Sequence, residues 1–150
     1  MSHSGSGVII GAGGHAVVLL DLVEASETGI TISSAVVNEY SSGLGSRFPD
    51  IQQRVEGDGH FLSSTSPSLA SNGSGIPDNS TDARVNVFER YKSHGWRFPR
   101  LVHPSATVSD LTTLDEGSQI MAGVTLQAGS RVGENAVINT GAIVDHDCEI

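Results

Sequence analysis

The sequence predicts an α/β domain followed by a parallel β-helix. Two patterns carry this prediction: a strand, glycine turn, helix, strand order over residues 8–39, and an aliphatic residue at every sixth position from Val102 to Ile150. The composition agrees, because only 5% of the residues are aromatic and 18 of the 150 are glycine. Such a composition suits a turn-rich architecture better than a helix bundle, so any core must rest on Val, Ile, Leu and Ala.

The N-terminal part has the pattern of a βαβ unit. A short buried strand is expected at residues 8–10, and it runs directly into the glycine turn of residues 11–16, Gly-Ala-Gly-Gly-His-Ala. The apolar density of residues 17–25 predicts a half-buried helix, and residues 30–37 predict a second strand. A strand, helix, strand order implies a parallel sheet.

The middle of the chain is poor in apolar runs. Residues 40–82 contain few of them, and residues 63–75 are rich in Ser, Gly, Asn and Pro. Such a segment cannot bury enough apolar surface to offset the entropy of ordering, so we predict a loop there. A third strand over residues 60–62 is the one regular element we expect inside it.

A helix is predicted over residues 82–94. Val85, Phe88 and Tyr91 share helical spacing, and Gly95 is placed to end the helix. The pair Phe98-Pro99 then marks a break before the repeat begins.

From Val102 onward the sequence repeats every six residues. The aliphatic positions are Val102, Val108, Leu114, Ile120, Leu126, Val132, Ile138, Val144 and Ile150. Four residues after each of the first eight stands a small residue: Ala106, Thr112, Ser118, Val124, Ser130, Ala136, Ala142 and Cys148. A period of six is neither helical nor a simple strand alternation, and it fits a parallel β-helix with three short faces per coil. Each aliphatic side chain would point inward and stack on its equivalent in the next coil.

Charge and cysteine content restrict the partners and the compartment. The net charge of −9 argues against binding nucleic acid or an anionic membrane through a general electrostatic field. The single cysteine, Cys148, excludes an internal disulfide, as a reducing compartment permits. The longest apolar run near the N-terminus, residues 17–20, is too short for a signal or membrane helix. We therefore expect a cytoplasmic protein whose partners are small molecules or copies of itself.

Three segments carry a family resemblance: residues 11–16, residues 101–106 (Leu-Val-His-Pro-Ser-Ala) and residues 138–148 (Ile-Asn-Thr-Gly-Ala-Ile-Val-Asp-His-Asp-Cys). They resemble the sialic acid O-acetyltransferase and bacillosamine N-acetyltransferase family of hexapeptide-repeat sugar acyltransferases. The resemblance implies a Rossmann-like domain over residues 1–100 that holds a nucleotide sugar. It also implies a left-handed β-helix from residue 101 that binds acetyl-CoA, and a homotrimer with active sites between adjacent chains.

The same resemblance implies that His146 is the general base and that Asp147 raises its basicity. The chemistry is consistent, because a neutral imidazole titrates near working pH and a neighbouring carboxylate fixes its tautomer. Transfer would then be direct, within a ternary complex, without an acyl-enzyme. His146 could instead be an ordinary surface residue, and Cys148 occupies a small-residue position where packing explains it better than a thiol mechanism.

Substrate binding is expected at the glycine turn. Gly13, Gly14 and His15 would stand at a helix N-terminus whose free amides suit a phosphate, and the resemblance assigns this loop to the diphosphate of a UDP-sugar. It also implies that Asn38 and Glu39 replace a common acidic pair. Structural turn glycines would explain the loop equally well.

Two further sites follow from the resemblance or from spacing. Asn139, seven residues before His146, would face the acceptor, although an exposed turn residue is an equal alternative. Asp78-Asn79 resembles a sugar-nucleotide loop in which Pro77 stands where glycine is usual. His3, His60 and His94 have no metal-ligand spacing, so no metal is expected.

The sequence thus supports two functions. The first is an acetyl-CoA-dependent acetyltransferase acting on an amine or hydroxyl of a nucleotide sugar or sialic acid-like sugar. The second is a truncated, non-catalytic fragment that at most binds a nucleotide sugar. Residues 102–150 hold fewer than three coils of three hexapeptides, so we expect the β-helix to be incomplete and the 150-residue chain to have little or no activity. The sequence leaves open the sugar, the acyl group, and N- versus O-transfer.

Overall fold

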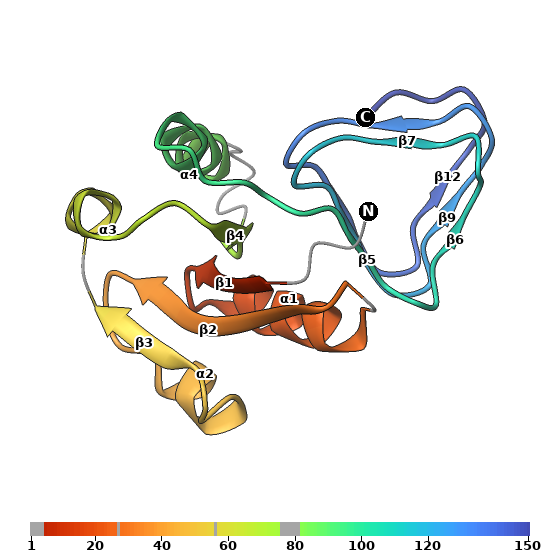
Figure 1. The fold of residues 1–150 in the computed structure, drawn as a ribbon. Helices are drawn as coiled ribbons and strands as arrows, with labels where there is room; N and C mark the ends of the chain where they lie inside the picture. Colours follow the sequence, from red (N-terminus) through yellow and green to blue (C-terminus); the bar gives the residue numbers. More distant parts are fainter. Residues whose placement is uncertain (1–4, 27, 56, 76–81) are drawn as a thin grey trace.

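The computed structural model describes residues 5–26, 28–55, 57–75 and 82–150. It contains a parallel sheet flanked by helices and, beside it, a coil of triangular cross-section (Figure 1). The Asp78-Asn79 motif and His3 lie outside the described residues.

The sheet part consists of β1 (Gly5–Ile10), α1 (Gly14–Ala25), β2 (Ile30–Val37), α2 (Ser42–Arg47), β3 (Gln52–Val55), α3 (Asp58–Ser64), β4 (Leu69–Asn72) and α4 (Asp82–Ser93). The coil contains eight strands of two residues each: β5 (Leu101–Val102), β6 (Thr107–Val108), β7 (Thr113–Leu114), β8 (Gln119–Ile120), β9 (Thr125–Leu126), β10 (Arg131–Val132), β11 (Val137–Ile138) and β12 (Ile143–Val144).

The four-stranded sheet has the order β3-β2-β1-β4, and all its pairs are parallel. The predicted βαβ unit is confirmed, since α1 connects the parallel neighbours β1 and β2. Helices cover both faces (Figure 1). On one face, Leu19 and Leu22 of α1 pack with Ile9 of β1, and on the other Phe88 of α4 packs with Val8 and Ile10. The strands are therefore apolar on both sides, as parallel sheets require.

The predicted loop over residues 40–82 is wrong, because two helices and two strands lie within it. Its few apolar residues are concentrated at anchoring positions: Leu44 and Phe61 are fully buried, and all four residues of β4 are buried. β4 needs no apolar run of its own, since its neighbours supply the apolar surface. The strand predicted at residues 60–62 is also wrong. These residues lie in α3, where Ser63 and Ser64 donate hydroxyl hydrogen bonds back to the carbonyls of His60 and Phe61.

The helix predicted over residues 82–94 is confirmed as α4, but its buried face differs from the prediction. Phe88 and Tyr91 are buried, whereas Val85 is 40% exposed and Arg84 takes its place in the interior. The chain reverses at Gly95, which adopts φ +85°.

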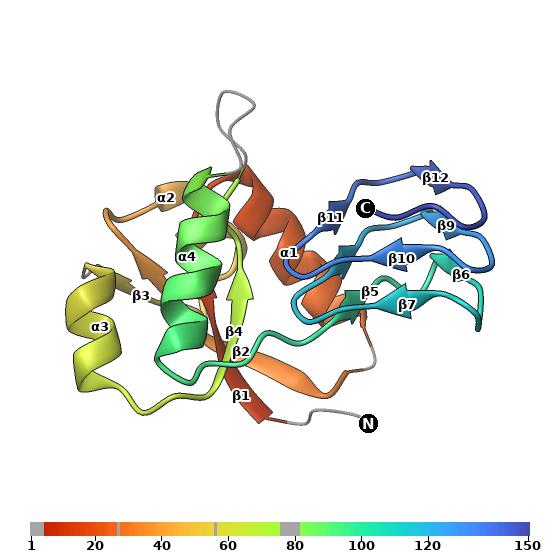
Figure 2. The same ribbon diagram turned by 90° about the horizontal axis from the view of Figure 1, so that it is seen from above.

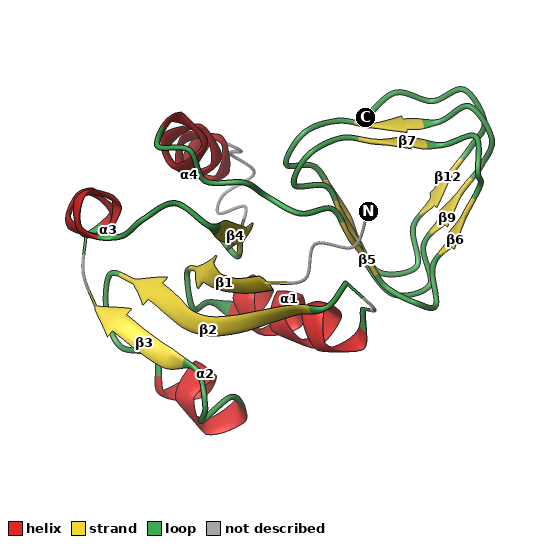
Figure 3. Ribbon diagram, viewed as in Figure 1, coloured by secondary structure: helices red, strands yellow, loops and turns green. Residues whose placement is uncertain are grey.

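The repeat forms a three-sided parallel β-helix, as predicted. Figure 2 shows its coils stacked edge to edge, and Figure 3 shows short strands joined by turns at the corners. Every strand pairs with one eighteen residues away, for example Val132 with Leu114 and Ile138 with Ile120. Ile120 and Val132 are completely buried, so the aliphatic positions do point inward. These stacked short parallel strands fit a left-handed β-helix.

Candidate active site

His146 and Asp147 lie in the turn after β12, at a corner of the β-helix. Their side chains are exposed, and His146 Nδ1 lies 2.9 Å from Asp147 Oδ2. A carboxylate only accepts, so Nδ1–H donates and leaves the Nε2 lone pair free to take a proton. The hydrogen bond and the charge of Asp147, with the charge of Asp145, raise the pKa of His146 above its ordinary value. The pair has the geometry of an oriented imidazole base.

The position of Asp147 depends on the coil beneath it. Its backbone adopts φ 56°, in the left-handed region, and its N–H donates to the carbonyl of Ala128 at 3.1 Å. Its carboxylate lies over Gly129, where an added Cβ would collide with Oδ1. The absence of a side chain at position 129 therefore leaves the space in which the carboxylate reaches His146.

Cys148 does not pack as expected. It is exposed, whereas Ser130, its equivalent one coil earlier, is only 1% exposed. The backbone of Cys148 keeps the register, since its carbonyl accepts from the N–H of Arg131 at 2.8 Å. The packing interpretation of its side chain is therefore wrong, because no described coil covers the side chain.

The glycine turn and the end of β2 line one cavity of about 460 Å³. Gly13, Asn38 and Glu39 border it together with Tyr40 and Ser41. The cavity lies at the carboxyl ends of β1 and β2, the edge of a parallel sheet at which ligands bind.

The turn glycines differ in what requires them. Gly11 adopts φ +95° and approaches the carbonyl of Gly73, so it is needed for the turn itself. Gly13 and Gly14 have neither a positive φ nor a neighbour within 4 Å of an added Cβ. Gly13 is the N-cap of α1, a position that glycine can occupy for local reasons, and the open space beside both glycines leaves room for a ligand.

His15 and Asn139 line a different cavity, of about 260 Å³, between the sheet and the β-helix. Its other walls are Ser74 and Gly75 after β4, Arg84 on α4, and Val137 of β11. Five of the six predicted substrate-binding residues thus separate into two groups, one with Gly13, Asn38 and Glu39 and one with His15 and Asn139, and Gly14 lines neither cavity. His146 lines neither of these cavities.

His15 is held in one tautomer by its neighbour on the β-helix. The amide of Gln119 donates from Nε2 to the carbonyl of Asn72 at 3.0 Å, so its Oε1 faces His15 Nε2 at 2.9 Å. His15 Nε2 therefore carries the hydrogen. Burial lowers the pKa of His15, the hydrogen bond to Gln119 opposes this, and the charge of Arg84 lowers the pKa further. The ring is neutral at pH 7.

Arg84 and Gln119, which are 3% and 2% exposed, were not predicted as site residues. Arg84 donates from Nε to the carbonyl of Asn135 and from Nη1 to those of Asn72 and Ser74, at 2.9–3.0 Å. One signal for Arg84 was available, since it precedes Phe88 and Tyr91 at spacings of four and seven on the same helix face. Gln119 occupies an outward position of the repeat. Its side chain is buried only because the sheet part covers that face of the β-helix, so the repeat gives no signal for it.

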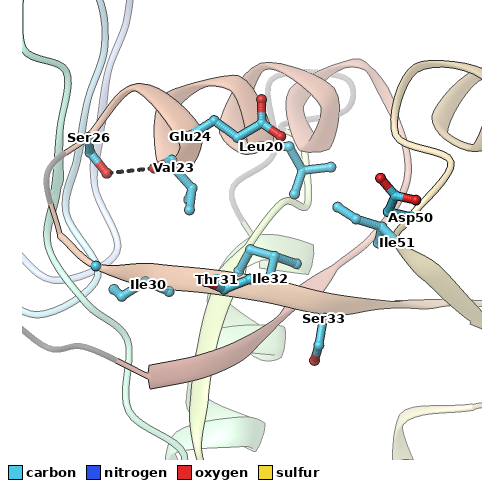
Figure 4. Close-up of a pocket in the computed structure, with 11 residues that line it drawn as sticks. Leu20, Val23, Glu24, Ser26, Ile30, Thr31, Ile32, Ser33, Asp50 and Ile51 are labelled. Carbon is cyan, nitrogen blue, oxygen red and sulfur yellow. Dashed lines mark hydrogen bonds between the residues drawn. The ribbon is translucent and has the colours of Figure 1, made fainter.

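A third cavity, of about 670 Å³, lies between α1 and the first half of β2 (Figure 4). Leu20, Val23, Ile30 and Ile51 line it, with the carboxylates of Glu24 and Asp50. None of the predicted site residues borders it. In the described part of the chain no cluster of three potential metal ligands occurs, and no helix is long and apolar enough to cross a membrane.

No family model matches the chain, but solved structures do. PerB from Caulobacter crescentus, solved in complex with CoA and GDP-perosamine, is 34% identical over 97% of this chain with a TM-score of 0.79. The chain shares its fold. A variant of the same GDP-perosamine N-acetyltransferase, in which one histidine is replaced by alanine, matches with the same values. The acetyltransferase domain of PglB from Neisseria gonorrhoeae, in complex with acetyl-CoA, is 29% identical over 97% of this chain with a TM-score of 0.75.

These neighbours agree with the predicted class of sugar acetyltransferase and with acetyl-CoA as the co-substrate. The finer assignment to sialic acid O-acetylation or bacillosamine N-acetylation stays a prediction. The chain spans 65% of the PerB chain and 67% of the PglB domain.

Proposed function

We propose that this chain is an acetyl-CoA-dependent N-acetyltransferase acting on the amine of a nucleotide-linked amino sugar. The observation that carries the proposal is the 34% identity, over 97% of this chain, to an enzyme that binds CoA and GDP-perosamine. The Caulobacter enzyme is an N-acetyltransferase by name, which favours an amine over a hydroxyl acceptor.

His146 acts as the general base in this proposal. Attack of the amine on the thioester carbonyl requires removal of a proton, and the free Nε2 of His146 accepts it. Asp147 holds the ring in the required tautomer and stabilises the imidazolium that forms. Transfer is direct, so Cys148 has no covalent role. The histidine variants among the PerB structures support a role for one histidine in that enzyme.

The acceptor is proposed to lie along the carboxyl edge of the sheet, which makes the N-terminal part a Rossmann-like nucleotide-sugar domain. Gly13, Asn38 and Glu39 would contact the nucleotide side, and His15 and Asn139 the sugar side. His146 lines neither cavity of its own chain, so we propose that adjacent chains complete each site, in the homotrimer that the family resemblance implies.

Turnover measured with the protein as its gene encodes it, including any residues encoded after Ile150, tests this function. The substrates are acetyl-CoA and a GDP- or UDP-linked 4-amino sugar, and the readout is release of the CoA thiol. His146→Asn is expected to reduce kcat by about 100-fold or more, the usual contribution of a general base. His94→Asn, a change at an exposed histidine directly after α4, is the matched control and should retain the rate. Equal rates for the parent and the His146→Asn variant would exclude His146 as the base.

The alternative is a chain that binds a nucleotide sugar without transferring an acetyl group. The two cavities at the sheet edge favour at least this binding. Titration calorimetry of the 150-residue chain with the nucleotide sugar, combined with the turnover assay, separates the two functions. If the nucleotide sugar binds but the full gene product transfers no acetyl group, only the alternative remains. If the full gene product transfers the acetyl group, the alternative is excluded.

A further inference from the structure

Arg84 is a buried cation whose positive charge has no described counterion. Its guanidinium donates three hydrogen bonds, all to backbone carbonyls, and Nη2 has no hydrogen-bond partner among the described residues. No carboxylate in the described ranges forms an ion pair with it. A buried charge is costly unless it is paired, and arginine keeps its charge at neutral pH. Among the described residues, the positive charge of Arg84 is therefore not balanced by a carboxylate.

This cation borders the cavity of about 260 Å³ at the junction of the sheet and the β-helix. The strand order β3-β2-β1-β4 reverses direction between β1 and β4, and the cavity lies beyond the carboxyl ends of these two strands. A reversal point of this kind is where open parallel sheets bind ligands. The remaining polar lining, from His15, Ser74 and Asn139, is uncharged at pH 7, so Arg84 sets the sign of the local potential.

We propose that this cavity is an anion-binding site in which Arg84 supplies the positive charge. Rigid guanidinium groups recognise the paired oxygens of phosphates and carboxylates, so the ligand is an oxyanion. If the proposed function is correct, that oxyanion belongs to the acceptor: either the diphosphate of its nucleotide or a carboxylate on the sugar ring.

Binding of free anions to the 150-residue chain tests the site without any need for turnover. The probes are inorganic pyrophosphate, UDP and glucuronate, each added at constant ionic strength with sodium chloride as the reference. Thermal unfolding gives the shift in Tm, and titration calorimetry gives Kd. Pyrophosphate should raise Tm more than chloride does. UDP and glucuronate then identify the source, because a diphosphate site favours UDP and a sugar-carboxylate site favours glucuronate.

The direct variant, Arg84→Gln, removes hydrogen bonds to three backbone carbonyls, and a loss of binding in it would not distinguish a lost charge from a lost fold. Asn139→Asp avoids this problem, since Asn139 is exposed and the change is nearly isosteric. A carboxylate at the cavity wall would neutralise Arg84 and repel the ligand, so Kd for pyrophosphate should rise by about tenfold or more. Asn86→Asp adds the same charge to an exposed position of α4 outside the cavity, and its Kd should change by less than about twofold.

The anion-binding experiment can fail or succeed independently of the test of the proposed function. Failure of every anion to stabilise the parent beyond chloride overturns the anion site, even if the protein turns over substrate. Equal Kd values for the Asn139→Asp and Asn86→Asp variants overturn it as well. Anion binding that Asn139→Asp abolishes, in a protein without transferase activity, supports the site and rejects the proposed function.

Discussion

At the scale of single residues, His146 and Asp147 differ from the other candidates in being adjacent in the chain. Their hydrogen bond needs only a local turn, which is why a short sequence motif was enough to predict the pair. Arg84 and Gln119 meet their partners through contacts between distant segments: His15 and Gln119 are 104 residues apart. A pattern of residue types carries no information about such a contact until the fold brings the segments together.

Replacing Asp147 by Asn should lower the pKa of His146. Asp147 is the largest cause of the raised pKa, through both its hydrogen bond and its charge. Because the folded-state pKa is raised, the pair stabilises the protein at low pH, and this contribution is lost as the pH rises through that pKa. An NMR titration of the His146 ring protons measures the change. Asp145→Asn should give a smaller decrease, since Asp145 acts through charge alone, and a larger decrease in that variant would contradict the assignment.

The same substitution should move the pH dependence of transfer. The base must be neutral to act, so the acidic limb of the rate profile follows the pKa of His146. In the Asp147→Asn variant this limb should shift to lower pH while the plateau rate falls, because the imidazolium loses its stabilising carboxylate. An unshifted limb in a profile of kcat/KM would mean that another group titrates.

At the scale of elements, the sequence was informative where an element supplies its own apolar pattern. The six-residue repeat predicted the inward positions because every coil contributes equally to the core. α2, β3, α3 and β4 were missed because each buries at most four residues, and β3 buries none, so each relies on its neighbours for apolar surface. A period cannot be detected in elements that short, so their polar composition was mistaken for a loop.

Gly73, at the end of β4, is expected to tolerate no side chain. A Cβ there would lie 2.8 Å from the carbonyl oxygen of Ile10 and 2.9 Å from the Cβ of Ala16, so α1 and β1 would have to move. Gly73→Ala should therefore destabilise the protein by about 1–3 kcal/mol, the usual result of overpacking. Gly75→Ala, two residues on, meets nothing within 4 Å and should be neutral. Urea denaturation of the two variants measures the difference, and equal stabilities would contradict this packing.

The inward column of the β-helix gives a second prediction for elements. Ile120 is completely buried and Ile143 is 73% exposed on an outward face. Ile120→Ala should cost about 2–5 kcal/mol of unfolding free energy through lost burial and a new cavity. The same substitution at Ile143 should cost less than about 0.5 kcal/mol. Guanidinium denaturation compares the two, and a similar loss at both positions would contradict the inward orientation.

At the scale of the whole molecule, polar contacts connect the sheet part to the β-helix. Gln119 links His15 on α1 with Asn72 on β4, and Arg84 on α4 binds the carbonyl of Asn135 in the β-helix. Buried polar networks are sensitive to the loss of any member, since each unpaired group keeps its desolvation penalty. The βαβ pattern and the six-residue repeat predicted two parts, but the geometry of their junction required the structure.

Gln119→Ala should weaken this junction. It leaves the Nε2–H of His15 and the carbonyl of Asn72 without this partner, which should lower the unfolding free energy by about 1–3 kcal/mol. Gln127→Ala, at an exposed glutamine of the β-helix, is the control and should change stability by less than about 0.5 kcal/mol. Denaturation gives the energies, and hydrogen exchange at the start of α1 should accelerate only in the Gln119 variant. Unchanged exchange there would mean that the apolar contacts alone hold the junction.

The eighteen-residue spacing between paired strands restricts how the chain can change in length. A six-residue insertion before His146 would preserve the inward pattern but would move His146 to the next of the three corners. An eighteen-residue insertion would return it to the same corner, displaced along the axis by one strand spacing of about 4.8 Å. Insertions before His146 should thus preserve the fold when their length is a multiple of six residues. They should preserve the position of the base at its corner only when their length is a multiple of eighteen. Even a single added coil would have to be matched by a shift of the bound acceptor.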